Sequence, residues 1–310
     1  TTVFGFLFPP VDLRFDRPPT VLVISPRDRI ELVETVLLHA DVPSMERDRL
    51  ERELLEFYDL SALVVDLAGL ATYPSLVNDL RELRSVSRTA AHEWLHHYFT
   101  FHALGRHYRS SPEMLAINET VADMAGRELG DILFVRMGGD LSVSENRYLS
   151  VEERDPVFTR EMRKTRQRTE ELLAKGNIVE AEEYLKERWW FLRLRGFRLR
   201  KLNQAYFAFN GAYAASAASI SPIGTQLKEL RDRFSGVGAF LKAVSAISNY
   251  QEYLNLLERH GVETLPQKVT TVKGSTSYVS RPLTPAVEHV QAYADLLGRG
   301  WPCCHWLPRC

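Results

Sequence analysis

The chain has 310 residues, of which 45% are hydrophobic and 25% are charged, and its formal net charge is −1. This composition is typical of a globular protein with a buried core, and the near-neutral charge argues against a nucleic-acid-binding protein. The three cysteines, Cys303, Cys304 and Cys310, all lie close to the C-terminus, which excludes a disulfide scaffold for the rest of the chain.

Residues 1–19 form a lead with several prolines that includes the apolar run from Val3 to Phe8. A helix needs about 20 apolar residues to span a bilayer, so this run is too short to do so. It is either the remnant of a membrane anchor or signal sequence, or a strand that packs on the domain. We favour the anchor, because a dense aromatic run is unfavourable at a free terminus. This interpretation places the main domain at a membrane, outside the cytoplasm; the alternative is a cytoplasmic protein.

The predicted main domain, residues 20–260, begins with a small sheet. Thr20–Ser25 and Ser61–Leu67 are short and rich in β-branched or apolar residues, which predicts two strands. Ile30–Leu38 is also apolar, but its pattern does not decide between a strand and a helix.

The charged segment Met45–Tyr58 predicts an amphipathic helix, because its apolar residues recur at helical spacing. Ser44 precedes this segment and is expected to be the N-cap of the helix. The residues expected on its apolar face are Leu50, Leu54, Leu55 and Tyr58.

A further helix is predicted over Val86–Ala103, with Gly105 as its stop signal, and it contains the sequence HEWLH. In a helix, His92 and His96 lie one turn apart and project from the same face. Two imidazoles in this arrangement can bind one zinc ion, and Glu93 beside them can take a proton from a water molecule on that ion.

The next helix is predicted over Ile117–Leu129, with Gly130 as its cap, and it contains the sequence NETVAD. Glu119 and Asp123 are four residues apart and therefore share one face of this helix. Glu119 can be a third zinc ligand, which leaves the fourth position of the ion open for water. Asp123 can accept a hydrogen bond from a ligand imidazole and so fix its orientation.

His102 is a rival third ligand, because it follows His96 by six residues, the spacing of the metzincin zinc peptidases. That spacing requires a glycine turn where this chain has Phe99, and six helical residues would rotate His102 by about 240° from His96. We therefore favour Glu119. The histidines expected to be partly exposed or hydrogen-bonded instead are His97, His102 and His107.

Together, HEWLH and NETVAD resemble the motifs of the gluzincin clan, the thermolysin-like zinc metallopeptidases. The resemblance implies that His92, His96 and Glu119 bind Zn²⁺. It also implies that Glu93 is the general base and that Asp123 supports a ligand histidine. Members of this clan carry a small sheet before the HEWLH-type helix, and its edge strand binds the substrate backbone.

From Pro156 to Arg195 the chain is densely charged with helical periodicity, interrupted at Lys175-Gly176-Asn177. This pattern predicts a helical hairpin. Acidic residues flank its basic ones, which indicates a solvated surface rather than a site for phosphates or lipid headgroups. The expected seam residues are Leu172, Leu173, Ile178, Ala181, Tyr184 and Leu185.

A helix over Lys201–Ala215 would carry one polar stripe of Asn203, Tyr206, Asn210 and Tyr213. Two interpretations remain open: the helix lines a substrate cleft with a tyrosine that donates to the oxyanion, or its tyrosines bond to nearby loops. For the first interpretation we choose Tyr213 over Tyr206. The segment Lys201–Leu257 also loosely resembles a bacterial family of predicted aminopeptidases.

Three short helices, Thr225–Phe234, Val237–Ile247 and Gln251–His260, are expected to close the domain before a polar tail over residues 261–310. The predicted fold is α+β and mostly helical. The predicted function is zinc-dependent hydrolysis of peptide bonds in a peptide or protein substrate. The alternative is a non-catalytic zinc-containing module that binds a protein partner through the charged hairpin. Nucleic acid is not an expected partner, and the oligomeric state is left open.

Overall fold

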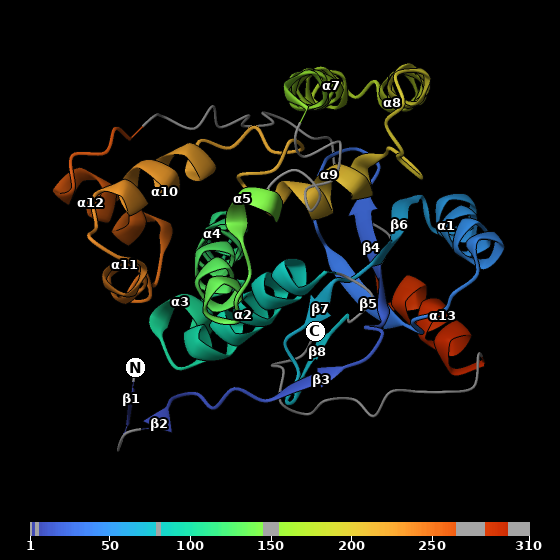
Figure 1. Ribbon diagram of the computed structural model, residues 1–310. Helices are drawn as coiled ribbons and strands as arrows, with labels where there is room; N and C mark the ends of the chain where they lie inside the picture. The colour runs from blue at the N-terminus through green and yellow to red at the C-terminus, as the bar shows by residue number, and fades with distance from the viewer. Residues whose placement is uncertain (1, 4–5, 79–81, 145–154, 265–282, 297–310) are drawn as a thin grey trace. The chain divides into compact units, whose positions relative to one another are not determined.

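The structure, a computed structural model, describes residues 2–3, 6–78, 82–144, 155–264 and 283–296. The chain forms two compact units, each assembled from segments that are distant in the sequence. The first unit contains residues 1–18, 68–154 and 212–267, and the second contains residues 19–67, 155–211 and 268–310. Helices dominate the described residues and accompany small sheets (Figure 1), so the fold is α+β and mostly helical, as the sequence predicts.

The second unit is built on an antiparallel sheet with the strand order β5-β4-β6. Its strands are β4 (Thr20–Pro26), β5 (Glu34–Leu38) and β6 (Leu60–Asp66), and helices α1 (Ser44–Tyr58), α9 (Gln204–Gly211) and α13 (Leu283–Leu296) pack on it. Both predicted strands are confirmed, and the ambiguous apolar run contains the strand β5. Side chains of β4 alternate between two cores: Leu22 and Ile24 face α1 and α13, whereas Val21 and Val23 face α9.

The helix α1 occupies the predicted segment, but two details of the prediction are wrong. Its N-cap is Pro43, whose extended backbone leads into the helix, so Ser44 is already the first helical residue. Leu50 and Leu54 are fully buried, whereas Leu55 is 40% exposed. One residue corresponds to about 100° of helix rotation, which carries Leu55 past the edge of the buried face.

The helix α13 lies within the segment that we expected to be a polar tail. Its Ala286 and Val290 are buried in the same core as Leu22 and Ile24, so part of this segment belongs to the fold of the second unit. The three cysteines lie outside the described residues.

The charged hairpin of the second unit is confirmed as α7 (Pro156–Leu173) and α8 (Ile178–Leu194). Gly176 adopts a φ of +78° in the turn, a conformation that favours glycine. Leu172, Leu173 and Ala181 are buried along the seam, with Ile178 and Tyr184 packed against them.

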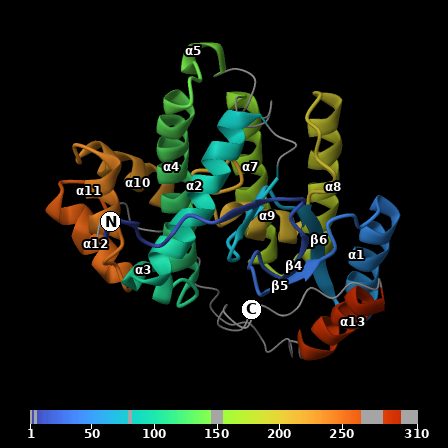
Figure 2. The same cartoon turned by 60° about the horizontal axis from the view of Figure 1, so that its bottom comes forward.

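The first unit is organised around two long helices, α2 (Leu83–Thr100) and α4 (Pro112–Arg136), which lie side by side (Figures 1 and 2). The short helix α3 (Ala103–Arg106) connects them. The helix α4 begins five residues before the predicted start, because Ser111 accepts a hydrogen bond from the Met114 backbone N–H and Pro112 suits the first helical position.

Two glycines of α4 explain how closely the long helices approach. A Cβ atom on Gly130 would lie 2.4 Å from Cα of Arg88, and one on Gly126 would lie 3.0 Å from Cα of His92. The prediction that Gly130 ends the helix is therefore wrong: α4 continues past it, and the missing side chain lets α2 pack against it. Gly105 was likewise expected to stop α2, but it lies in α3, where a Cβ would be 2.2 Å from the carbonyl oxygen of Phe99.

An adjacent face of α2 carries a second small sheet with the order β3-β8-β7, which we did not predict. Its strands are β3 (Leu13–Phe15), β7 (Gly69–Leu70) and β8 (Ser75–Val77); β3 is parallel and β7 antiparallel to β8. Gly69 touches α2 directly, since a Cβ there would lie 2.7 Å from Thr89 and 2.5 Å from the carboxylate of Glu93. The next turn of α2 carries His97, whose ring bonds to the backbone of Ala71 and Thr72.

The three predicted closing helices are confirmed as α10 (Ile223–Asp232), α11 (Val237–Val244) and α12 (Tyr250–Arg259). They share one buried core with α2 and α4, which includes Leu95, Phe99, Ile117, Val121, Leu227, Phe240 and Tyr253. The remaining elements of the first unit are β1 (Thr2–Val3), β2 (Phe6–Leu7) and α5 (Leu141–Ser144). The lead is tied to α2 by a hydrogen bond of 2.9 Å from Trp94 Nε1 to the carbonyl oxygen of Pro9.

Candidate metal centre

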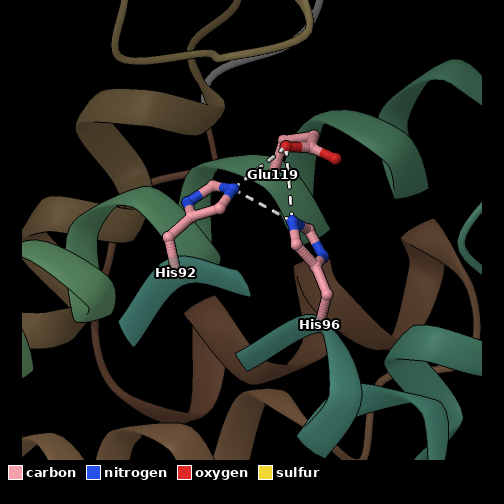
Figure 3. Close-up of side chains that lie close together, drawn as sticks. All are labelled: His92, His96 and Glu119. Carbon is pink, nitrogen blue, oxygen red and sulfur yellow. Dashed lines mark hydrogen bonds and ion pairs between the residues drawn. The ribbon is translucent and has the colours of Figure 1, made fainter. Parts of the chain in front are cut away.

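The face of α2 that meets α4 brings two histidines to one carboxylate. The Nε2 atoms of His92 and His96 are 3.0 Å apart. Oε2 of Glu119, on α4, lies 3.8 Å from Nε2 of His92 and 3.7 Å from Nε2 of His96. Figure 3 shows the three side chains converging on one point from the two helices.

The spacing of these three atoms fits a zinc ion. Zinc bonds to imidazole nitrogen or carboxylate oxygen are about 2.0–2.2 Å long, so tetrahedral ligand atoms lie roughly 3.3–3.6 Å apart. The observed distances of 3.0, 3.7 and 3.8 Å bracket this range. A point equidistant from the three atoms in their plane is about 2.0 Å from each, which is a zinc bond length. Two imidazoles and one carboxylate are also a donor set of catalytic zinc sites.

Two tyrosines hold the Glu119 carboxylate. The hydroxyl of Tyr108 donates to Oε1, whereas the other oxygen, Oε2, faces the histidines. Tyr213 also donates to the carboxylate. Burial opposes ionisation of Glu119, but the neighbouring histidines and the two hydroxyls outweigh it and lower its pKa. These neighbours therefore favour the ionised form of Glu119.

The imidazole of His92 is held in its neutral form. Burial and the neighbouring His96 lower the pKa of His92 to about 4, and its ring bonds to the backbone of Ala122. Asp123 does not make the hydrogen bond to a histidine that we predicted: the ring of His92 bonds to the backbone of Ala122 instead, and the carboxylate of Asp123 accepts from Nε of Arg127 at 2.9 and 3.1 Å. Its negative charge still favours the protonated form of His92. A neutral imidazole is the form that binds metal.

Glu93 is the exceptional carboxylate of this site. The residue is 7% exposed, and among the described residues it has neither a hydrogen-bond donor nor an ion-pair partner. Burial and the charge of Glu119 raise its pKa well above its usual range. The other deeply buried carboxylates are satisfied: Glu119 by its two tyrosines, and Glu51 of the second unit by Arg200, Lys201 and a backbone N–H.

The structure separates the two tyrosines that the sequence places on one stripe. The helix α9 ends at Gly211, earlier than predicted, so Tyr213 lies beyond it in the first unit. The ring centroid of Tyr213 is 6.4 Å from that of His92. Tyr206 instead packs on the sheet of the second unit, beside Val21 and Val23.

The other histidines near the motif are bound elsewhere. Nδ1 of His102 is 2.7 Å from the carbonyl oxygen of Tyr98, and Nδ1 of His107 is 3.0 Å from that of Ala103. His97 lies against the turn after β7. His102 is therefore not part of the cluster in this structure.

Tyr108 is the site residue that sequence reasoning missed. It lies in the polar connection between α3 and α4, a segment that carries no metal-binding motif. The one available signal is that this connection joins the two helices that carry the candidate ligands.

Comparisons of the chain with protein-family models, with curated proteins and with solved structures find no match.

Proposed function

We propose that the chain is a zinc-dependent peptidase that acts on a peptide or protein substrate. The observation that supports it best is the buried Glu93, which has no partner among the described residues and lies beside His92, His96 and Glu119. Burying a carboxylate without a partner is costly, so such a group is expected to serve a reaction rather than the stability of the fold.

The proposed reaction divides its roles among residues of α2 and α4. His92, His96 and Glu119 would hold the zinc ion. When bound, zinc polarises the carbonyl of the scissile bond and makes water reactive near pH 7. Glu93 accepts the proton of the attacking water and passes it to the leaving amine, for which a raised pKa is suitable.

Tyr213 is proposed to stabilise the oxyanion. The charge of Glu119 and burial raise the pKa of Tyr213 well above its usual range, so its hydroxyl remains a donor. In the free protein this hydroxyl bonds to Glu119, and substrate binding would exchange that bond for one to the substrate oxygen.

The strand β7 is the best candidate for the substrate-binding edge. Within the described residues it pairs only with β8, so its other edge offers unpaired backbone groups. Gly69 in this strand lies directly against Glu93. An extended peptide that pairs with β7 would therefore pass beside the proposed base.

Replacement of Glu93 by Gln tests this proposal. We expect Glu93→Gln to lower the turnover of a peptide library about 10²–10⁴-fold, because the proton acceptor is lost, while zinc binding is retained. Glu56→Gln is the matched control, since Glu56 is exposed on α1 of the second unit. Normal cleavage by Glu93→Gln would refute the role of the base.

The wild-type protein decides between the two predicted functions. Chelator-sensitive cleavage of the library would support the peptidase, whereas bound zinc without any cleavage would favour the non-catalytic binding module. Membrane anchoring remains a prediction; no helix among the described residues is long and apolar enough to span a bilayer.

A further inference from the structure

The two oxygens of Glu119 have different neighbours. Oε2 faces Nε2 of His92 and of His96, at 3.8 and 3.7 Å. Oε1 accepts the hydroxyl of Tyr108, whose ring centroid is 6.1 Å from that of His96. An ionised carboxylate can only accept a hydrogen bond, so the hydroxyl of Tyr108 is the donor in this contact.

The different neighbours of the two Glu119 oxygens matter for any metal held by the cluster. A carboxylate can bind a metal with one oxygen or with both. If both oxygens of Glu119 bound, the second would compete for the position that a catalytic zinc site keeps open for water and substrate. A hydrogen bond to Oε1 opposes that second contact.

The backbone around Tyr108 is fixed on both sides. Before it, the chain turns tightly, because the missing side chain of Gly105 allows close contact with Phe99, and the side chain of Leu104 is fully buried. After it, Ser111 caps α4, the helix that carries Glu119. The side chain of Asn118, next to Glu119, donates to the carbonyl oxygen of Leu104 at 3.3 Å. Tyr108 is therefore placed by packed elements.

We propose that Tyr108 is a positioning residue that makes Glu119 present a single oxygen, Oε2, to the metal. This inference rests on the proposed function only in requiring a zinc ion at the cluster. It gives the two tyrosines separate tasks: Tyr108 orients the metal ligand, and Tyr213 serves the substrate oxyanion.

Replacement of Tyr108 by Phe tests the proposal, because it removes the hydroxyl and keeps the ring. We expect the zinc dissociation constant of Tyr108→Phe to rise about 10–100-fold, the usual cost of losing a partner of a metal ligand. The measurement is competition for zinc with a chromophoric chelator. X-ray absorption at the zinc edge should show an added second oxygen from a carboxylate in the variant.

Tyr98→Phe is the control, since Tyr98 is a buried tyrosine of α2 whose ring packs on Trp94 and His102. It should bind zinc like the wild type, and circular dichroism should show the same fold for both variants.

Unchanged zinc affinity and coordination in Tyr108→Phe would overturn the proposal, even if turnover fell, because Tyr108 would then act on the substrate. Failure of the wild type to bind zinc would overturn this proposal together with the proposed function. Zinc binding without peptide cleavage would refute only the peptidase. The zinc affinities of the wild type and Tyr108→Phe would then still decide whether Tyr108 positions Glu119.

Discussion

Glu93 and Glu119 show how the surroundings shift the pKa of one residue type in opposite directions. Glu119 is surrounded by histidines and two hydroxyl donors, which lower its pKa and keep it an anion. Glu93 has no donor among the described residues, and burial raises its pKa. Two carboxylates whose pKa values are shifted in opposite directions suit a metal ligand and a proton carrier respectively.

Tyr213 provides a prediction at the scale of a single atom. Removing the hydroxyl in Tyr213→Phe should lower kcat about 10²–10³-fold, because one donor to the oxyanion is lost. The assay is run at saturating zinc, because Tyr213 also donates to Glu119 and its loss is expected to weaken metal binding as well. The measurement is steady-state cleavage of a peptide by zinc-loaded protein, with Tyr206→Phe, in the second unit, as the control. A variant with normal kcat would show that the oxyanion donor is another group.

The pairing of α2 with α4 creates the site. Gly126 and Gly130 let the backbones approach, and the carboxylate of Asp131 accepts paired hydrogen bonds from both Arg84 and Arg88. These contacts set the rotation of α2, so that His92 and His96 emerge opposite Glu119. On the adjacent face of α2, Glu93 meets β7 at Gly69.

Gly130 provides a prediction at the scale of an element. Alanine favours a helix over glycine by about 1 kcal/mol, but the new Cβ would overlap the Arg88 backbone at 2.4 Å. Overpacking of this kind costs about 1–3 kcal/mol, so Gly130→Ala should lower the free energy of unfolding.

The control for this prediction is Gly238→Ala in α11, where an added Cβ meets no atom within 4 Å. That variant should be as stable as the wild type or slightly more so. Denaturant unfolding of both variants measures the difference. If Gly130→Ala were stabilised like the control, the close approach of α2 and α4 would be disproved.

At the scale of the whole molecule, the order of the elements along the chain does not predict how they group into two units. Each unit takes up three segments of the sequence, and α13 joins the core that contains the first strands of the second unit. Local periodicity predicts most helices and two strands correctly, because it depends on neighbouring residues. The assignment of alternating sequence segments to two units depends on contacts between residues far apart in the sequence. The place of α13 in the core of the second unit depends on such contacts as well.

The site residues differ in the same way: some depend on local sequence and others on contacts with distant segments. His92 and His96 share a face because of the helical repeat alone, which the sequence contains. Tyr108 depends on how the chain turns between α3 and α4, which no local pattern records. A glycine such as Gly130 often marks the end of a helix. In this chain it lies inside α4, because α2 packs too closely to allow a side chain there.

Zinc stoichiometry is the most direct test of the central claim, that two imidazoles and Glu119 hold one metal ion. After zinc loading and dialysis, the wild-type chain should retain one zinc ion, and Glu119→Ala should retain much less while its circular dichroism stays unchanged. Elemental analysis of both proteins provides this measurement. Equal zinc content in the two proteins, or none in the wild type, would contradict the account.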